Sequence, residues 1–235
     1  MHNKGIIALT CCVALCFGCF AAGNNGLREI PDLAMNITIS GMTDGTTYRA
    51  YWLDKSLKAE GPVSSNKKNG LWKIFFKGTN GTSVMAEINF KNDLIDGELK
   101  EYYPSGRVRT VTDYSNGIMN GRHMTYYESG IGNLEESFRD GKKIGKSLEY
   151  FENGNIKENA YFLNDLRNGA STTFYENGKR QAIGRYIDGK KNGPWEHFFE
   201  NGMLQSKGSY RDDKKIGVWS YYNESGKKVE DEHYD

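Results

Sequence analysis

The chain has 235 residues, enough for one large or two small domains, and a formal net charge of +1 at pH 7. This near-balance argues against a nucleic-acid-binding protein, which needs a clustered basic excess. Proline numbers only 4 beside 28 glycines, which excludes collagen-like and proline-rich sequences, and the abundance of tyrosine and phenylalanine favours short strands joined by tight turns.

The first element in chain order is an apolar run, MHNKGIIALTCCVALCFGCFAAG, with one lysine near its start. Its length suits the hydrophobic region of a signal peptide and is short for a membrane span. Because the composition turns abruptly polar at Asn24, we predict a signal peptide over residues 1–19. A buried N-terminal strand or helix is the alternative.

All four cysteines lie in this run, so the body of the chain has neither a disulfide nor a cysteine metal site. The stretch LCFGC resembles a bacterial lipobox, with Gly18 before Cys19, and predicts lipidation of Cys19. The competing interpretation is cleavage after Gly23. We therefore expect an exported, membrane-anchored lipoprotein, periplasmic or outer-membrane, or alternatively a secreted protein. Residues 20–35 would form a linker.

Residues 36–69 are predicted to cap the N-terminal end of the fold. The stretch NITISGMTDG alternates apolar and polar residues, which favours one further strand that closes this edge. Residues 46–69 resemble a degenerate copy of the repeat that follows, with Tyr51 and Trp52 at its aromatic pair. Terminal repeats often diverge because one side has no neighbour.

Residues 70–235 consist of seven copies of a unit that is 24 residues long. Glycine recurs at offsets zero and nine, an aromatic pair at offsets five and six, and a lone aromatic at offset seventeen. The first copy carries a three-residue insertion around GTNGTS. The glycines that open the copies are Gly70, Gly97, Gly121, Gly145, Gly169, Gly193 and Gly217.

Each unit has the pattern of one antiparallel β-hairpin. Two runs rich in aromatic and β-branched residues flank an Asn-Gly or Ser-Gly pair, such as Asn177-Gly178, which predicts a type I′ turn. No segment shows the helical pattern that a parallel crossover would need. Eight units of 24 residues, counting 46–69, predict an all-β, elongated antiparallel β-hairpin repeat solenoid. Its roughly sixteen strands would form a twisted sheet about 75 Å long.

The recurring glycine, aromatic pair, ENGK, Gly-x-Tyr and DGKKNG resemble the bacterial variant of the MORN repeat, the YwqK-type antitoxin family. The resemblance covers residues 70–235 well and 46–69 weakly. It implies a hairpin solenoid that serves as a scaffold or a membrane-associated interaction module. The antitoxin name implies neutralisation of a cytosolic toxin, which an exported protein would not meet.

No cluster of catalytic or metal-ligating residues interrupts the periodicity. The histidines beyond the first segment, His123, His197 and His233, occupy different offsets in different units and lack metal-ligand spacing. We interpret them as surface or strand-packing side chains. No Gly-x-Ser-x-Gly elbow and no phosphate-cradling loop occurs. We therefore expect no enzyme activity, no catalytic or metal site and no cofactor.

Charged residues form two recurring rows at opposite turns. Glutamates at offset seven lie beside the Asn-Gly turn, and lysine pairs lie in the other turn. One interpretation is solubility and protection of the turns. The other is that the lysine edge meets anionic lipid headgroups, lipopolysaccharide or an acidic protein. These pairs are Lys67-Lys68, Lys142-Lys143, Lys190-Lys191 and Lys214-Lys215.

The aromatic residues at offsets five and six are consecutive, so their side chains point to opposite faces of the sheet. Either the twist closes one row into a core and neighbours cover the other, or an aromatic face remains for a partner protein or for sugar rings. Cell-wall and glucan-binding repeats also use short hairpins with tryptophan and paired tyrosine, which keeps glycan binding open. Against it, only three tryptophans share offset two and four units lack one. The candidate interaction surface comprises Trp72, Trp195, Trp219, Lys142, Lys143, Lys190, Lys191, Lys214 and Lys215.

Three classes of function remain open. The first is a non-catalytic protein-interaction or scaffolding surface at the bacterial cell envelope, with an unknown envelope protein as partner. The second is a glycan- or lipid-binding envelope module, with a polysaccharide or membrane lipid as partner. An antitoxin-like neutralising partner is a variant of the first class, and an enzyme is the least favoured class. No nucleic-acid partner is expected.

Overall fold

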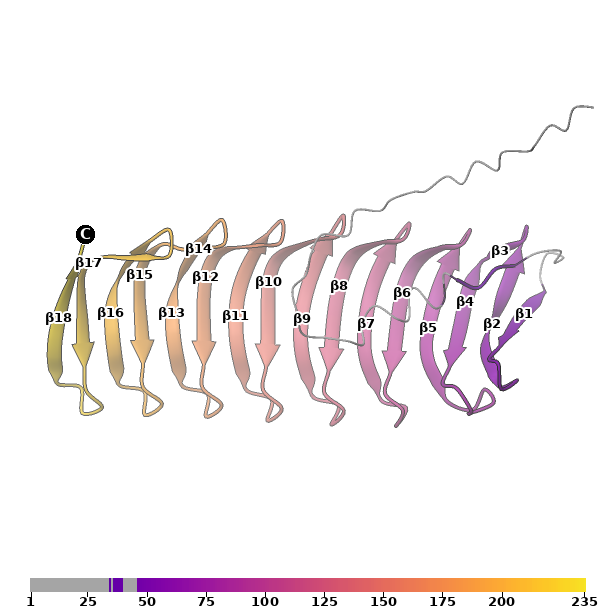
Figure 1. Cartoon of the computed structure of the whole chain (residues 1–235), viewed down its shortest axis with the longest axis horizontal. Helices are drawn as coiled ribbons and strands as arrows, with labels where there is room; N and C mark the ends of the chain where they lie inside the picture. The colour runs from indigo at the N-terminus through magenta and orange to yellow at the C-terminus, as the bar shows by residue number, and fades with distance from the viewer. Residues whose placement is uncertain (1–33, 35, 40–45) are drawn as a thin grey trace, which may run out of the picture.

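The computed structural model describes residues 34, 36–39 and 46–235. The predicted signal peptide, Cys19 and the linker apart from Ala34 lie outside these residues. The described chain forms one open sheet in which all neighbouring strands pair antiparallel (Figure 1). This arrangement confirms the predicted hairpin solenoid.

The sheet has 18 strands. They are β1 (Thr47–Tyr51), β2 (Leu57–Ser64), β3 (Lys67–Lys68), β4 (Gly70–Phe75), β5 (Val84–Lys91), β6 (Leu94–Tyr102), β7 (Val108–Ser115), β8 (Ile118–Tyr126), β9 (Gly132–Arg139), β10 (Lys142–Tyr150), β11 (Ile156–Leu163), β12 (Leu166–Phe174), β13 (Arg180–Ile187), β14 (Lys190–Lys191), β15 (Gly193–Phe198), β16 (Leu204–Arg211), β17 (Lys214–Tyr222) and β18 (Lys228–Tyr234). Two of these, β3 and β14, are two-residue strands that continue as β4 and β15 after one residue. When β3 is counted with β4 and β14 with β15, the 18 strands become sixteen, the number predicted for eight hairpins.

The turn that contains Asn-Gly is not type I′, so this prediction was wrong. In the turn after β10, Gly154 N donates to Phe151 O at 2.9 Å and Phe151 N donates to Asn155 O at 2.8 Å. Gly154 has a φ of 87°, whereas Asn153 does not have positive φ. This is a three-residue loop in which a type I turn is followed by a left-handed glycine. The Asn153 side chain stabilises it by accepting a hydrogen bond from Asn155 N at 2.9 Å.

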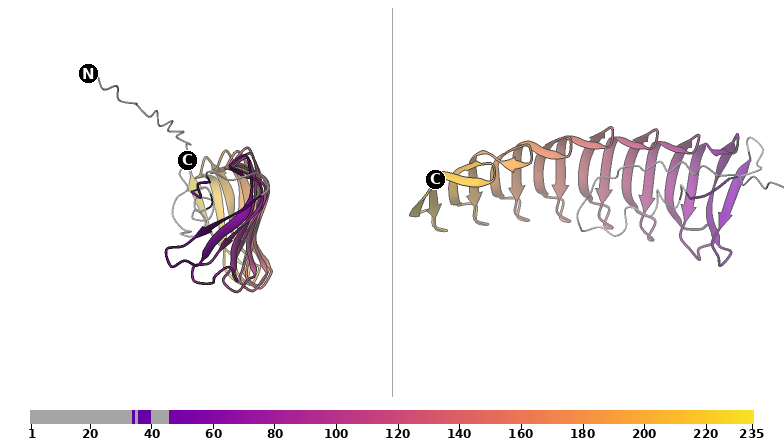
Figure 2. Two further views of the ribbon diagram at one scale, coloured as in Figure 1. Left: turned by 90° about the vertical axis from the view of Figure 1, so that its right-hand side faces the viewer. Right: turned by 45° about the horizontal axis from the view of Figure 1, so that its top comes forward.

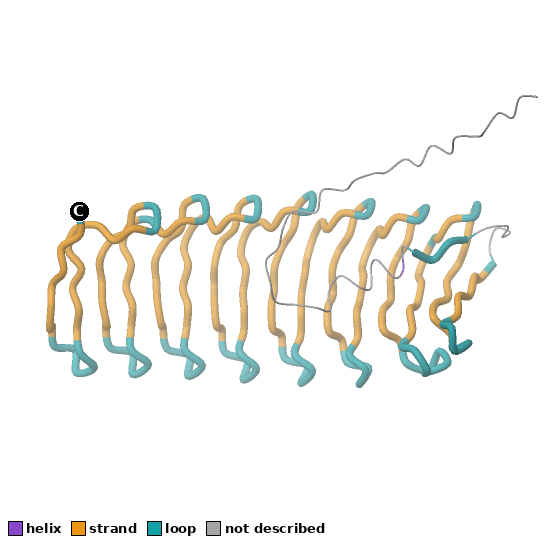
Figure 3. The backbone as a smooth tube through the Cα atoms, in the orientation of Figure 1, coloured by secondary structure: helices purple, strands orange, loops and turns teal. Residues whose placement is uncertain are grey.

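Type I′ geometry occurs instead at the opposite edge of the sheet, where the Lys-rich segments begin (Figure 3). Asp188 and Gly189 have φ values of 48° and 83°. Asn164 and Asp165 adopt 49° and 71° without any glycine. Asn and Asp tolerate this left-handed region better than other L-residues, so both turn sequences suit the same geometry.

The glycine at offset zero lies at a β-bulge inside a strand, not in a turn. Between β11 and β12, Ala160 pairs with Ser171 and Phe162 pairs with Arg167, so Tyr161 faces three residues. Gly169, at the centre of these three, has a φ of 124°, and a Cβ there would lie 3.0 Å from Tyr161 Cβ. Glycine is needed for both reasons, and repeated bulges add to the twist of the sheet. Figure 2 shows the bowed strands and the twisted row.

The N-terminal end of the fold differs from the predicted cap. Residues 36–39 form no strand, and the remainder of the predicted strand, residues 40–45, lies outside the described residues. Ala34 and Ile37 are buried against the N-terminal hairpins. The first described strand of the sheet is β1, whose hairpin with β2 falls within residues 46–69.

We call the face that carries Trp72, Trp195 and Trp219 the inner face, and the opposite face the outer face. Two apolar clusters lie at the ends of the inner face, one around Trp72 and the other around Trp195 and Trp219. Between them, β7 to β12 bury polar side chains instead. These are Thr110, Thr112, Glu136, Ser147 and Ser171.

Candidate functional site

The three tryptophans predicted for the interaction surface are buried. Their exposed fractions are 0% for Trp72, 4% for Trp195 and 1% for Trp219. Each indole lies across a glycine of the preceding unit, and a Cβ on Gly184 would lie only 2.1 Å from Trp195 Cδ2. Trp195 Nε1 also donates to Arg185 O at 3.2 Å. The tryptophans are therefore core residues, and including them in an exposed surface was wrong.

The lysine pairs do not form one basic row, because consecutive strand residues point to opposite faces. Lys142, Lys190 and Lys214 are exposed. Their neighbours Lys143, Lys191 and Lys215 are less exposed and lie on the inner face against aromatic rings. The sequence prediction of a lysine edge therefore holds for only one member of each pair.

The inner-face cations at offset 22 follow a common pattern in the middle of the sheet. Lys143 Nζ lies 3.6 Å from the centroid of the Phe162 ring and forms an ion pair with Glu136. Arg167 lies between the rings of Phe162 and Tyr186 and donates from Nη2 to Glu158 at 2.7 Å. Each cation thus has a ring and a carboxylate as partners.

The last two cations of this series are held differently. Lys215 Nζ donates to the hydroxyls of Tyr221 at 2.7 Å and Tyr234 at 3.2 Å, and both hydroxyls donate in turn to Glu232. The hydrogen bond to Tyr221 raises the pKa of Lys215. Lys191 Nζ lies 4.5 Å from the Trp195 ring and 5.1 Å from the Tyr210 ring. The backbone N of Lys191 donates to Asp213 Oδ1 at 2.8 Å, but within the described residues Lys191 Nζ forms no ion pair with a carboxylate.

Two of the three histidines after the first segment lie on the inner face. His123 Nδ1 lies 2.9 Å from Thr112 Oγ1, and burial lowers the pKa of His123. His197 stacks on Trp195 with ring centroids 6.0 Å apart. Burial lowers its pKa, and the positive charges of Lys191 and Lys215 lower it further. The lowered pKa values favour the neutral form of both rings, and each ring packs against an aromatic neighbour, Phe138 for His123 and Trp195 for His197.

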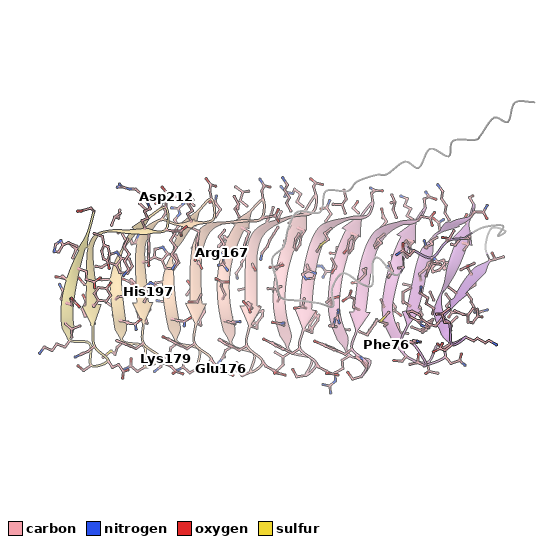
Figure 4. The ribbon with its side chains drawn as sticks, in the orientation of Figure 1. Phe76, Arg167, Glu176, Lys179, His197 and Asp212 are labelled. Atoms are coloured by element: carbon pink, nitrogen blue, oxygen red, sulfur yellow. The ribbon has the colours of Figure 1, made fainter. Side chains whose placement is uncertain are left out.

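Most of the recurring turn residues have a structural role that the sequence analysis missed. Tyr175, at offset six, donates its hydroxyl to Phe198 O of the next unit at 2.7 Å. Asn177 Nδ2 likewise donates to Glu200 O at 3.1 Å. Figure 4 shows Glu176 and Lys179 along this turn edge. The donor and acceptor lie 23 residues apart in both cases, close to the length of one unit. The repeat spacing in the sequence could therefore have indicated these bonds between units.

An exposed apolar patch on the outer face was also missed. Leu163 is 55% exposed and pairs with Leu166 across the β11–β12 turn. Tyr161 lies on the same face two residues before Leu163, and Ile187 follows one unit later, at the position of Leu163. We call Tyr161, Leu163, Leu166 and Ile187 the outer patch. The sequence does indicate this patch, because it has large apolar residues at offsets where the other units have mainly polar ones.

The outer patch has a basic border. Lys142 and Lys146 lie on β10 at one side, and Arg185 and Lys190 lie on β13 and β14 at the other. All four side chains are exposed, and none has a carboxylate partner within the described residues. An apolar centre with a charged rim is the usual anatomy of a protein–protein interface.

A hollow of about 300 Å³ opens on the inner face between β12, β13 and β15. His197 lines it, and Figure 4 labels this residue and Arg167 of β12. No group of three or more His, Cys, Asp or Glu among the described residues could hold a metal ion. The same residues contain no helix that is long and apolar enough to cross a membrane. The lining residues are Ser171, Thr173, Tyr175, Gln181, Ala182, Tyr186, Lys191, Trp195, His197, Phe198 and Gln205.

Comparison with known families matches this geometry to one repeat type. The MORN repeat variant family matches residues 95–116, 143–164, 167–188, 191–212 and 215–235. The chain is a MORN-repeat protein. No curated protein matches the chain. MORN repeats are in general non-catalytic modules that can mediate interactions with proteins or membranes.

Both unusual surfaces belong to the MORN repeats. The outer patch begins in the repeat at 143–164 and ends in the repeat at 167–188, and the hollow extends from 167–188 into 191–212. The repeats supply a regular backbone, and a few positions that depart from the pattern create local surfaces on it. These departures, and not the shared repeat, distinguish the surfaces of this chain.

Proposed function

We propose that this MORN-repeat protein is a non-catalytic interaction module that binds a protein partner at the bacterial cell envelope. The outer patch is the binding surface, and the partner carries an apolar surface bordered by carboxylates. Export and anchoring through Cys19 are part of the proposal and are supported by the N-terminal sequence alone.

The observation that carries the proposal is the exposure of four large apolar side chains on three consecutive strands. Tyr161 is 43% exposed, Leu166 is 49% exposed and Ile187 is 41% exposed, beside Leu163 at 55%. Contiguous exposed apolar surface with a polar rim marks an interaction site. The four unpaired cations around it favour an acidic partner and exclude a basic one.

The proposal is tested by site-specific photo-crosslinking in cells that carry the full chain with Cys19 intact. A crosslinker at Leu163 is expected to capture one stoichiometric protein with an acidic surface. Leu166→Glu is expected to abolish this capture, because it puts a carboxylate in the centre of the patch. Leu94→Glu is the matched control, since Leu94 occupies the same offset in a distant unit and is 42% exposed.

Capture that survives Leu166→Glu, or that is equal with a crosslinker at Leu94, would contradict the proposal. Raised salt should weaken the complex, because the border contacts are electrostatic. Fractionation of the same cells tests the anchor: a Cys19→Ser variant should move from the membrane fraction to the soluble one.

A further inference from the structure

The hollow on the inner face stands out because of its single charged residue. Of its eleven lining residues only Lys191 is charged, and Ser171, Thr173, Gln181 and Gln205 add hydroxyl and amide groups. Its volume of about 300 Å³ is at the lower end of the range for small-molecule sites. The hollow therefore suits a small, polar ligand.

Comparison of successive units shows what Lys191 lacks. Arg167 and Lys191 occupy the same offset in neighbouring units, as do Glu158 and Ala182. In the unit that opens at Gly145, the ion pair between Arg167 and Glu158 fills the space between these two positions. In the next unit, which opens at Gly169, the short side chain of Ala182 leaves the corresponding space beside Lys191 open. This space is part of the hollow. Lys191 therefore keeps the cation of the preceding unit but lacks the carboxylate that pairs with it there.

Other groups in the hollow can bind the uncharged part of a ligand. The side chains of Thr173, Gln181 and Gln205 form no hydrogen bond within the described residues, and the ring nitrogens of His197 likewise have no such partner. A neutral imidazole offers one donor and one acceptor. These groups match the hydroxyls of a sugar or a hydroxy acid.

The surroundings limit the charge of the ligand. A second, acidic hollow adjoins this one and shares Thr173, Tyr175 and Gln181 with it. Its walls include Glu149 and Glu158, which are paired with Lys157 and Arg167. They also include Glu176 and Glu200, whose carboxylates form no ion pair within the described residues. A dianion would be repelled by these carboxylates, whereas one negative charge is balanced by Lys191.

We propose that the inner-face hollow is a binding site for a small monocarboxylate that also carries hydroxyl groups, of the chemistry and size of a single sugar acid. The carboxylate accepts hydrogen bonds from Lys191 Nζ in the space that Ala182 leaves open. The hydroxyls meet Thr173, Gln181, Gln205 and His197. This site lies on the face opposite the outer patch, so it stands or falls independently of the proposed protein-binding function.

Calorimetric titration of the full chain with D-glucuronate, D-glucose and inorganic phosphate tests the proposal. Saturable binding of glucuronate is expected, about tenfold or more tighter than binding of glucose, because a charge-assisted hydrogen bond is lost in the neutral sugar. Equal binding of both sugars, or binding of phosphate alone, would overturn the assignment.

Two variants, Lys191→Gln and Ala182→Glu, and one control variant, Lys190→Gln, test the role of the cation. Lys191→Gln is expected to weaken glucuronate binding about tenfold or more, while its neighbour Lys190→Gln, which removes the same charge from the outer face, leaves binding unchanged. Ala182→Glu introduces the residue that the preceding unit has at this position. It should abolish glucuronate binding, because the new carboxylate would form an ion pair with Lys191 in place of the ligand. If the Ala182→Glu variant does not fold, the glucuronate affinities of Lys191→Gln and Lys190→Gln still decide whether the cation binds the ligand. Binding that is unaffected by Lys191→Gln would refute the site.

Discussion

Single residues decide how one unit packs on the next. The Trp195 indole lies across Gly184, its cross-strand neighbour on β13. No residue larger than glycine fits at position 184. One unit earlier the equivalent pair is Ser171 opposite Ala160. A tryptophan thus stands against a glycine in one unit, whereas two small side chains stand opposite each other one unit earlier.

Gly184→Ala is expected to destabilise the protein by about 2–3 kcal/mol, because the new Cβ would overlap the Trp195 indole. Trp195→Ser alone should cost about 3–5 kcal/mol through the cavity that it leaves. The double variant recreates the Ala160–Ser171 arrangement, so its loss should be smaller than the sum of the two by about 1 kcal/mol or more. Urea unfolding measures all three, and strict additivity would contradict direct packing between the two residues.

Each hairpin is tied to the next by side chains at its turn as well as by the strand ladder. Tyr103, Tyr127 and Tyr175 donate their hydroxyls to the backbone of the following unit at 2.7–2.8 Å. Phe151 and Phe199 occupy the same offset and have no hydroxyl. The units therefore differ in how tightly they are coupled, although their backbones are alike.

Tyr175→Phe should lower stability by about 1 kcal/mol, since it leaves Phe198 O without this partner. Phe151→Tyr should raise stability by about 0.5–1 kcal/mol, because its new hydroxyl can reach the equivalent carbonyl of Phe174. Tyr161→Phe is the control, because the Tyr161 hydroxyl has no hydrogen bond within the described residues. Thermal unfolding measures the three variants. A stability change for Tyr161→Phe as large as that for Tyr175→Phe would contradict the assignment.

The described part of the molecule is a single open sheet whose extensive contacts join neighbouring strands. Ala34 and Ile37 cover part of the inner face at the N-terminal end. Over the rest of the described sheet, long polar side chains take the place of a second layer: Lys143, Arg167 and Lys191 lie over aromatic rings. Their aliphatic stems cover apolar surface while their charges stay near solvent.

Small-angle X-ray scattering of the full chain should therefore show an elongated particle. A compact globule of this length would have a radius of gyration of about 18 Å. Sixteen strands at a spacing of about 4.8 Å form a sheet about 75 Å long, whose radius of gyration is about 22 Å or more. A measured value near that of the globule would mean that the sheet folds back on itself in solution.

The sequence by itself determined the unit, its length and its antiparallel topology. A strict spacing of 24 residues between glycines and aromatics allows only a repeated local structure, and short runs between turn residues allow only hairpins. The wrong turn type at Asn-Gly arose because dipeptide preference does not distinguish a two-residue loop from a three-residue one. That choice depends on hydrogen bonds at both ends of the loop, such as Phe151 N to Asn155 O.

Only the tertiary structure decided which residues are exposed. Alternation along a strand assigns residues to two faces but does not say which face is covered, so Trp195 was predicted as surface although a glycine one unit away makes room for it. The same holds for Lys191: its sequence neighbourhood shows a basic turn, whereas its environment depends on Ala182, nine residues earlier and in a different strand. Burial is a property of neighbouring strands together, and periodicity within one strand does not contain it.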